Sequence, residues 1–263
     1  MAEEEVTNVE IPPEGEEPQQ TEPAREAVDD VAASEQPPQT DPMEGAAAVP
    51  LTVDLISKSL SLISKTGNGL SHAYTRLEIH GKGITNLDHL EKFPHVRHVD
   101  CSDNALVSIH GLAHLEFLLS FDGHSNQIRA IPDVLEKKKY LQTVNLARNS
   151  IRDFAIQSWP LATWINLNEN QLKTLSVQDF PELTQLEARS NWLESVVKVG
   201  NAAKLQKVYL AANEISSLEG LANVGQLQLL HLRNNKIENL DGVSDQWKSL
   251  TYLNLRFVIT VYI

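Results

Sequence analysis

The feature that most constrains this chain is a segment that repeats itself. The stretch 205–243, LQKVYLAANEISSLEGLANVGQLQLLHLRNNKIENLDGV, contains one pattern twice, with every position shifted by 22 residues. The first copy carries Leu205, Val208, Leu210, Asn213 and Ile215, and the second carries Leu227, Leu230, Leu232, Asn235 and Ile237. A unit of this size cannot bury its apolar face alone, so its copies must stack on one another. The repeat therefore predicts a solenoid.

The asparagine of this pattern recurs along most of the chain. The marker residues, spaced 21 to 23 apart, are Asn104, Asn126, Asn149, Asn170, Asn191, Asn213 and Asn235. Apolar residues tend to lie eight, five and three positions before each marker and two after it. This spacing is typical of leucine-rich repeats, in which each unit supplies one short strand and one return segment. We predict an α/β solenoid of the 22-residue class over 75–256, with parallel strands on a concave face and short 3₁₀ or helical turns on the convex face.

The marker asparagine has a physical role in such a ladder. Its side-chain amide can bond backbone groups of adjacent turns where the strand ends, groups that would otherwise be buried unpaired. An earlier unit fits the apolar pattern but has Lys82 at the marker, as expected of an atypical first repeat.

Residues 51–74 precede the ladder and are predicted to cover its first repeat. Thr52 is a candidate N-cap for a helix that runs to about Lys65, with apolar residues at helical spacing. Those apolar residues are Leu55, Ile56, Leu60 and Ile63. The glycines at 67 and 69 end the helix. Terminal repeats need a cover of this kind.

Residues 1–50 have a different composition from the rest of the chain. They hold 14 of the 35 acidic residues, eight of the 12 prolines, one basic residue and no aromatic residue. Such a segment buries too little apolar surface to offset the entropy of ordering, so we predict a disordered tail. It is either only solvating or an acidic interaction arm. The remaining 21 acidic and 21 basic residues leave 51–263 neutral, which argues against binding nucleic acid through bulk charge.

Several sequence features indicate the cellular compartment in which the protein works. The single cysteine, Cys101, excludes an internal disulfide framework and fits a reducing environment; its place in a strand predicts a buried small hydrophobe. The acidic N-terminus lacks the pattern of a secretory signal, and no run of residues is apolar enough to span a bilayer. We therefore expect a soluble, intracellular protein that contacts no membrane.

Residues 257–263, FVITVYI, break the pattern. Val258 stands where the marker asparagine is expected, and an apolar, β-prone terminus at the open end of a solenoid is an aggregation hazard. Two interpretations compete: a truncated or mispredicted end, which we favour, and a real terminus that a partner covers.

The residues between the buried strand positions face solvent on the concave side. In the N-terminal repeats they are carboxylates and imidazoles, namely Glu78, His80, His98, Asp100, Asp122 and His124. Because flat parallel strands hold side chains side by side rather than around a tetrahedron, we expect a solvated polar face and no metal site.

The C-terminal repeats present aromatic residues and arginines instead. We predict a protein-binding surface formed by Trp164, Arg189, Tyr209, Leu229, His231, Arg233, Tyr252 and Arg256. Protein interfaces are enriched in aromatic residues and arginine. An acidic or amphipathic segment of another protein is the expected ligand. The chain has no P-loop, no G-x-S-x-G and no Cys-x-x-Cys pair, so we expect no enzymatic activity, no cofactor and no small-molecule substrate.

Three segments carry a more specific resemblance: 60–74 (LSLISKTGNGLSHAY), 230–237 (LHLRNNKI) and 248–256 (KSLTYLNLR). Over 51–256 the chain resembles the leucine-rich repeat-containing protein 23 family, radial spoke proteins of motile cilia and flagella, which also have an acidic tail. The resemblance implies a non-enzymatic scaffold of the axoneme that binds other radial spoke components and supports ciliary or sperm-flagellar motility. Family members continue through further repeats, whereas this chain departs from them after Arg256, which favours truncation. The alternative function is a soluble regulatory adaptor of the phosphatase-regulator kind.

Overall fold

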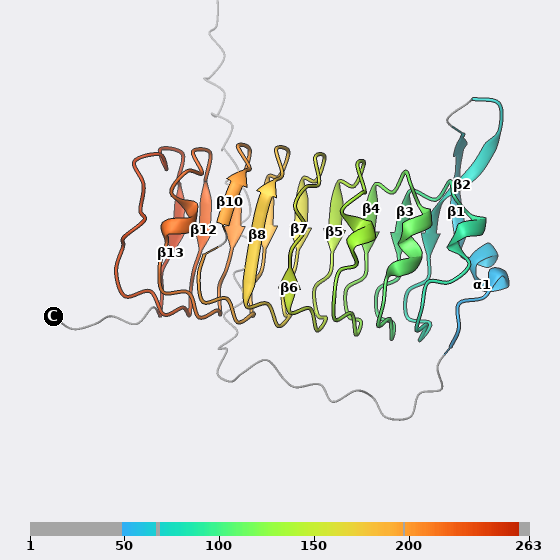
Figure 1. Ribbon diagram of the computed structural model, residues 1–263, viewed down its shortest axis with the longest axis horizontal. Helices are drawn as coiled ribbons and strands as arrows, with labels where there is room; N and C mark the ends of the chain where they lie inside the picture. Colours follow the sequence, from blue (N-terminus) through green and yellow to red (C-terminus); the bar gives the residue numbers. More distant parts are fainter. Residues whose placement is uncertain (1–48, 67–68, 197, 258–263) are drawn as a thin grey trace, which may run out of the picture. The chain divides into compact units, whose positions relative to one another are not determined.

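A computed structural model describes residues 49–66, 69–196 and 198–257 (Figure 1). The tail predicted for 1–50 lies almost wholly outside these residues, and so does the segment 257–263 apart from Phe257. In the described part, one strand per repeat is stacked beside the next to form a leucine-rich repeat solenoid, as the period predicts. The main sheet has ten strands.

The main sheet runs in the order β1-β2-β3-β4-β5-β7-β9-β11-β12-β13. Its strands are β1 (Leu60–Lys65), β2 (His72–Glu78), β3 (His98–Asp100), β4 (Ser120–Asp122), β5 (Thr143–Asn145), β7 (Trp164–Asn166), β9 (Gln185–Glu187), β11 (Lys207–Tyr209), β12 (Leu229–His231) and β13 (Tyr252–Asn254). Only β1 is antiparallel to its neighbour. From β2 onward the pairing is parallel and joins equivalent residues of successive repeats, as where Lys207 pairs with Leu229 and Leu229 with Tyr252. Each repeat position therefore forms a column across the sheet.

The apolar positions of the repeat form one continuous core. Before the marker Asn191, for example, Leu183, Leu186 and Ala188 are fully buried, and so is Leu193 after it. Cys101 lies in the same core, where burial raises the pKa of its thiol well above the ordinary value. An unreactive thiol packed as a small apolar side chain is the expected result.

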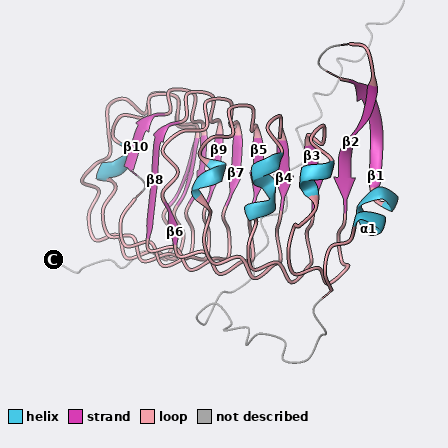
Figure 2. Ribbon diagram, turned by 45° about the vertical axis from the view of Figure 1, so that its right-hand side comes forward, coloured by secondary structure: helices cyan, strands magenta, loops and turns pink. Residues whose placement is uncertain are grey.

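The convex side differs in part from the prediction. It carries the expected 3₁₀ helices, η1 (Leu90–Lys92), η2 (His110–His114), η3 (Asp133–Leu135) and η4 (Glu219–Leu221). Between η3 and η4, however, β6 (Asp153–Phe154), β8 (Thr174–Asp179) and β10 (Lys198–Asn201) form a second, parallel sheet (Figure 2). In β8 the buried residues Leu175 and Val177 alternate with solvent-facing ones, which is the strand period. The described residues form a solenoid of stacked parallel strands with a single α-helix.

A close approach fixes the second sheet. A Cβ atom on Gly200 of β10 would lie 2.5 Å from the carbonyl oxygen of Gln178 in β8, so only glycine fits there. None of the helices in the described part of the chain is long and apolar enough to cross a membrane.

The N-terminal cover is not the helix predicted to run to Lys65. Helix α1 spans only Val53–Lys58, although Thr52 does cap it by accepting a hydrogen bond from the Leu55 amide. Ser59 ends the helix, and β1 follows at once and pairs with β2. The edge of a parallel sheet exposes unpaired backbone groups, which a hairpin strand satisfies and a helix cannot. Ile63, assigned to the apolar helix face, is consequently 58% exposed.

All seven marker asparagines make equivalent hydrogen bonds. In the most buried one, Asn170, Nδ2 donates to the carbonyl oxygens of Leu146, Leu167 and Asn168, and Oδ1 accepts from the Ile151 amide, at 2.9–3.2 Å. Each asparagine thus joins its own repeat to the preceding one. The residue just before each marker is left-handed, with φ of 53–56°: Asp103, Ser125, Arg148, Glu169, Ser190, Ala212 and Asn234. This bend turns the chain out of the sheet and aims the asparagine inward.

A second set of side chains bonds backbone carbonyls on the convex side. Lys138 and Trp159 occupy equivalent positions of adjacent repeats, and Trp247 recurs near the C-terminal end. The Lys138 ammonium donates to the carbonyl oxygens of Ala113 and Leu115, at 3.0 and 2.8 Å. Each indole N–H donates to a leucine carbonyl of the preceding repeat, at 2.8 and 3.0 Å. These polar groups satisfy carbonyl groups that the return segments leave buried.

Candidate protein-binding surface

Three columns of side chains line the solvent-facing side of the main sheet. The first column is Arg76, His98, Ser120, Thr143, Trp164, Gln185, Lys207, Leu229 and Tyr252, and the second is Glu78, Asp100, Asp122, Asn145, Asn166, Glu187, Tyr209, His231 and Asn254. The third column follows two residues after the second: His80, Ser102, His124, Ala147, Asn168, Arg189, Ala211, Arg233 and Arg256. The parallel register holds neighbours within a column about 4.8 Å apart.

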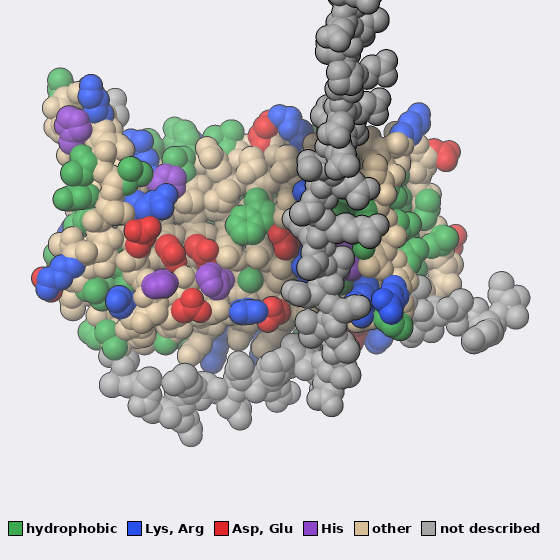
Figure 3. All heavy atoms as spheres, turned by 180° about the vertical axis from the view of Figure 1, so that it is seen from behind, with side chains coloured by type: hydrophobic (Ala, Val, Ile, Leu, Met, Phe, Trp, Pro, Cys, Tyr) green, Lys and Arg blue, Asp and Glu red, His purple; other side chains and the backbone are tan. Residues whose placement is uncertain are grey.

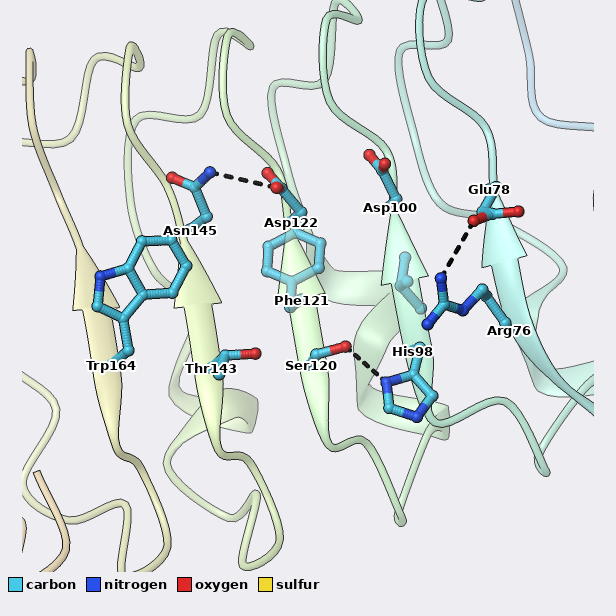
Figure 4. A pocket seen from close by; sticks show the side chains of 11 residues that line it. Arg76, Glu78, His98, Asp100, Ser120, Phe121, Asp122, Thr143, Asn145 and Trp164 are labelled. Atoms are coloured by element: carbon cyan, nitrogen blue, oxygen red, sulfur yellow. Dashed lines mark hydrogen bonds and ion pairs between the residues drawn. The ribbon is translucent and has the colours of Figure 1, made fainter. Parts of the chain in front are cut away.

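The N-terminal part of this face, from β2 to β5, is polar and partly hollowed (Figures 3 and 4). A shallow depression of about 210 Å³ is lined by residues of the first two columns, among them Asp100, Asp122 and Asn145. Figure 4 shows Asn145 donating to Asp122 and His98 bonded to the Ser120 hydroxyl. Burial, followed by the charges of the neighbouring Arg76 and Arg97, lowers the pKa of His98.

Two carboxylates of this zone, those of Asp100 and Asp122, accept hydrogen bonds from the protein's own backbone. Asp100 Oδ1 accepts from the amide and hydroxyl groups of Ser102, at 3.0 and 2.7 Å. Asp122 Oδ1 accepts from the His124 amide at 3.1 Å and contacts the His124 ring at 2.7 Å. Among the described residues, no group of three or more His, Cys, Asp or Glu side chains is placed to hold a metal ion. The geometry is that of strand-end turns.

The C-terminal part of the face holds a connected group of arginine and aromatic side chains. We name it the Arg–aromatic cluster: Arg189, Tyr209, His231, Arg233, Tyr252, Arg256 and Phe257. The guanidinium of Arg189 stacks 4.3 Å from the Tyr209 ring centroid. His231 lies edge-on between Tyr209 and Tyr252, with ring centroids 6.4 and 6.3 Å away. Aromatic edges and stacked guanidinium groups both stabilise such an arrangement.

The charge state of His231 follows from its neighbours. Burial, then the charges of Arg189 and Arg233, lower the pKa of this imidazole. Asn254 Nδ2 lies 3.1 Å from His231 Nε2, which fits a neutral ring that accepts this hydrogen bond. The cluster therefore combines arginine charges with an uncharged aromatic centre.

The structure brings together seven of the eight residues predicted for the surface, but not Trp164. Leu229 is half-buried beside the cluster in the first column, on the same strand as His231. Trp164 is also half-buried, not exposed as expected; its indole N–H donates to Glu187, and the ring lines the N-terminal depression (Figure 4). We assign it to the polar zone because its ring lines this depression together with Asp122 and Asn145; one strand, β9, separates it from the strand of Tyr209.

Sequence reasoning missed Phe257 as a member of the cluster. Its ring lies 5.3 Å from the Arg233 guanidinium and 4.8 Å from that of Arg256. The residue had been grouped with an irregular terminus, yet its left-handed φ of 58° matches that of the residue before each marker asparagine. The third column ends at Arg256, so the sequence alone indicates that Phe257, the next residue, lies beside the arginine column.

Comparison with known proteins shows what the chain is similar to. No family model matches the chain. Leucine-rich repeat-containing protein 23 from Bos taurus is 42% identical over 106 residues, and that from Homo sapiens is 38% identical over 104 residues. The resemblance to leucine-rich repeat-containing protein 23 is confirmed. Each match covers 40% of this chain, and the chain spans about 30% of the length of these curated relatives.

Solved structures support the fold alone. The functional domain of InlJ from Listeria monocytogenes superposes with a TM-score of 0.64 at 23% identity, over 72% of this chain and 41% of that one. The LRIM1/APL1C complex gives a TM-score of 0.63 at 20% identity, over 69% of this chain and 35% of that one. Leucine-rich repeat solenoids serve as protein-interaction scaffolds, and this chain has that architecture.

Proposed function

We propose that this protein is a non-enzymatic scaffold of the axonemal radial spoke that binds other spoke components through its concave face. The observation that supports it most is the Arg–aromatic cluster, together with the identity to leucine-rich repeat-containing protein 23. Aromatic and arginine side chains held by mutual stacking lose little entropy when a partner docks, which favours binding. The assignment to cilia and flagella follows the resemblance of the sequence to radial spoke proteins.

Retention in the axoneme tests this proposal. A tagged full chain is expressed in ciliated cells, the membranes are removed with detergent, and the axonemes are separated from the soluble fraction. We expect the chain to remain with the axonemes and to be released only by high salt. Complete release by detergent alone would instead favour a soluble regulatory adaptor.

A charge-reversal variant connects the retention to the surface. Arg233→Glu should reduce retention, because it places a carboxylate in the arginine column. Arg152→Glu, an equal charge change at an exposed residue outside the three columns, should not. If both variants were retained like the unmodified chain, the partner would bind elsewhere on the solenoid.

A further inference from the structure

Most of the Arg–aromatic cluster lies on β11 to β13, where the columns carry no carboxylate. From β11 to β13, the three columns contain one lysine and two arginines and no acidic residue, and Arg189 adjoins them on the β9 side. The nearest acidic column residue, Glu187, accepts hydrogen bonds from the neutral side chains of Trp164, Gln185 and Asn168. The charge of this patch is positive and complements an acidic ligand.

The stacked arginines are arranged to bind carboxylates. A guanidinium that lies flat on an aromatic ring keeps its N–H edge directed outward, and that edge matches a carboxylate with two parallel hydrogen bonds. The Arg189 guanidinium lies 4.3 Å from the Tyr209 ring centroid, and its Nε is buried without a hydrogen-bond partner among the described residues, so a ligand carboxylate would bind its terminal nitrogens. Arg256 is held 4.8 Å from the centroid of the Phe257 ring. Fixing the arginines beforehand lowers the entropy cost of binding.

The spacing of the arginine column indicates the shape of the ligand. Arg256 and Arg233 lie on adjacent strands, about 4.8 Å apart, whereas Arg233 and Arg189 are separated by the strand that carries Ala211, about 10 Å. Along a helix, residues i, i+3 and i+10 lie at about 0, 4.5 and 15 Å, which matches this column. Same-face residues of an extended strand repeat about every 6.7 Å and match it less well. The small Ala211 leaves room between the two arginines.

We propose that the Arg–aromatic cluster binds an acidic helix of another protein, with the carboxylates of one helix face on the arginine column. The helix runs along the solenoid, across the strands, and its apolar side chains pack on Tyr209, His231 and Tyr252. This inference rests on the proposed scaffold function and specifies the chemistry of its partner.

Binding of synthetic helical peptides to the full chain tests the inference. The probe is a fluorescent alanine-based peptide with glutamates at i, i+3, i+7 and i+10 and leucines beside them. Its binding is measured by fluorescence anisotropy at low salt. A second peptide replaces the glutamates by glutamines, and a third scatters the same glutamates around the helix. We expect both control peptides to bind about tenfold more weakly or worse, as charge pairing and one-sided geometry require. Equal binding of all three would overturn the inference.

Variants of the protein locate the binding. The double variant Arg233→Gln with Arg256→Gln should bind the probe with about tenfold lower affinity, whereas Arg152→Gln should change the affinity less than twofold. Ala211→Glu keeps every stacked arginine, adds a carboxylate between Arg189 and Arg233, and should also abolish binding. If these variants kept the native melting temperature and bound the probe unchanged, the cluster would not be the site.

The chain's own acidic residues 1–50 are the competing occupant. A variant with the acidic residues of that segment replaced by amides should bind the probe with unchanged affinity. Binding at least tenfold tighter than that of the unmodified chain would show that the segment competes for the cluster, and would overturn the assignment to another protein. Axonemal retention can persist through other surfaces if the peptide fails to bind, so the two proposals fail separately.

Discussion

The two halves of the concave face have the same backbone register but use their side chains differently. From β2 to β7, the second column consists mainly of Asp and Asn residues that accept hydrogen bonds from the amide two positions later, as Asp100 does from Ser102. From β9 to β12, Glu187, Tyr209 and His231 replace them and contact other side chains instead, whereas Asn254 of β13 again accepts from the amide two positions later. The first half of the face stabilises its own strand ends, and the second half forms an arginine and aromatic surface.

This difference separates polar side chains that stabilise the fold from those that we propose bind a partner. The carboxylates and imidazoles of the N-terminal zone look like a site in the sequence, but Asp100, Asp122 and His124 bond within the strand-end turns, and His98 bonds the hydroxyl group of Ser120. The arginines of the C-terminal zone lie against aromatic rings, Arg189 on Tyr209 and both Arg233 and Arg256 on Phe257. We therefore expect the interruption of a structural column, rather than the presence of charge, to mark the binding surface that we propose.

Removal of a marker asparagine should have the largest effect on the free energy of unfolding. The loss should be similar in both halves of the face. Asn170→Ala leaves four backbone groups of two repeats without their side-chain partner, three of them deeply buried. At about 1–3 kcal/mol for each unsatisfied buried group, partly relieved by relaxation, we expect a loss of about 3 kcal/mol or more in unfolding free energy. Chemical denaturation monitored by circular dichroism measures it.

Asn239→Ala provides the matched control. This exposed asparagine accepts one hydrogen bond from the Asp241 amide, and its removal should cost less than about 1 kcal/mol. Equal losses for Asn170→Ala and Asn239→Ala would show that the ladder is not the main link between repeats.

The ladder was also what the sequence revealed best. The period of 21–23 residues and the apolar positions around each asparagine predict the main sheet, its core and its register, because burial leaves few residue types at those positions. The hairpin strand β1 could not be predicted in this way, since LSLISK suits a helix as well as a strand and only the unpaired edge of β2 decides between them. The second sheet β6-β8-β10 depends on adjacent return segments pairing, which no single repeat encodes.

The candidate surface was predictable in outline. The alternation rule places Arg189, Tyr209 and Arg233 on one face, and the structure adds their stacking. The alternation rule could not assign Trp164 to either half, because only the structure shows that its ring lines the polar depression.

An acceptor substitution in the N-terminal half should have an intermediate effect. Asp100→Ala leaves the amide and hydroxyl groups of the buried Ser102 without an acceptor, so we expect a loss of about 1–2 kcal/mol in unfolding free energy. Asp100→Asn keeps an acceptor oxygen in place and should cost clearly less. Thermal unfolding of the two variants distinguishes a structural role from an electrostatic one: if Asp100→Asn were as damaging as Asp100→Ala, the carboxylate charge would matter and the contrast between the two halves would be weaker.

The smallest expected effect is the pH dependence of stability that arises from two histidines, one in each half of the face. Burial and neighbouring arginines lower the pKa values of His98 and His231 below the ordinary value of 6.5. Below about pH 6.5 the unfolded chain therefore binds more protons than the folded one. Both residues thus lower the free energy of unfolding as the pH falls through the folded pKa values. Well above pH 6.5 they have no effect on it. Because the arginines are separate, Arg76→Gln should raise only the pKa of His98, and Arg189→Gln only that of His231. Titration of the imidazole proton resonances by NMR measures both values in each variant. A shift of both histidines by either substitution would mean that the two halves of the face are electrostatically one surface.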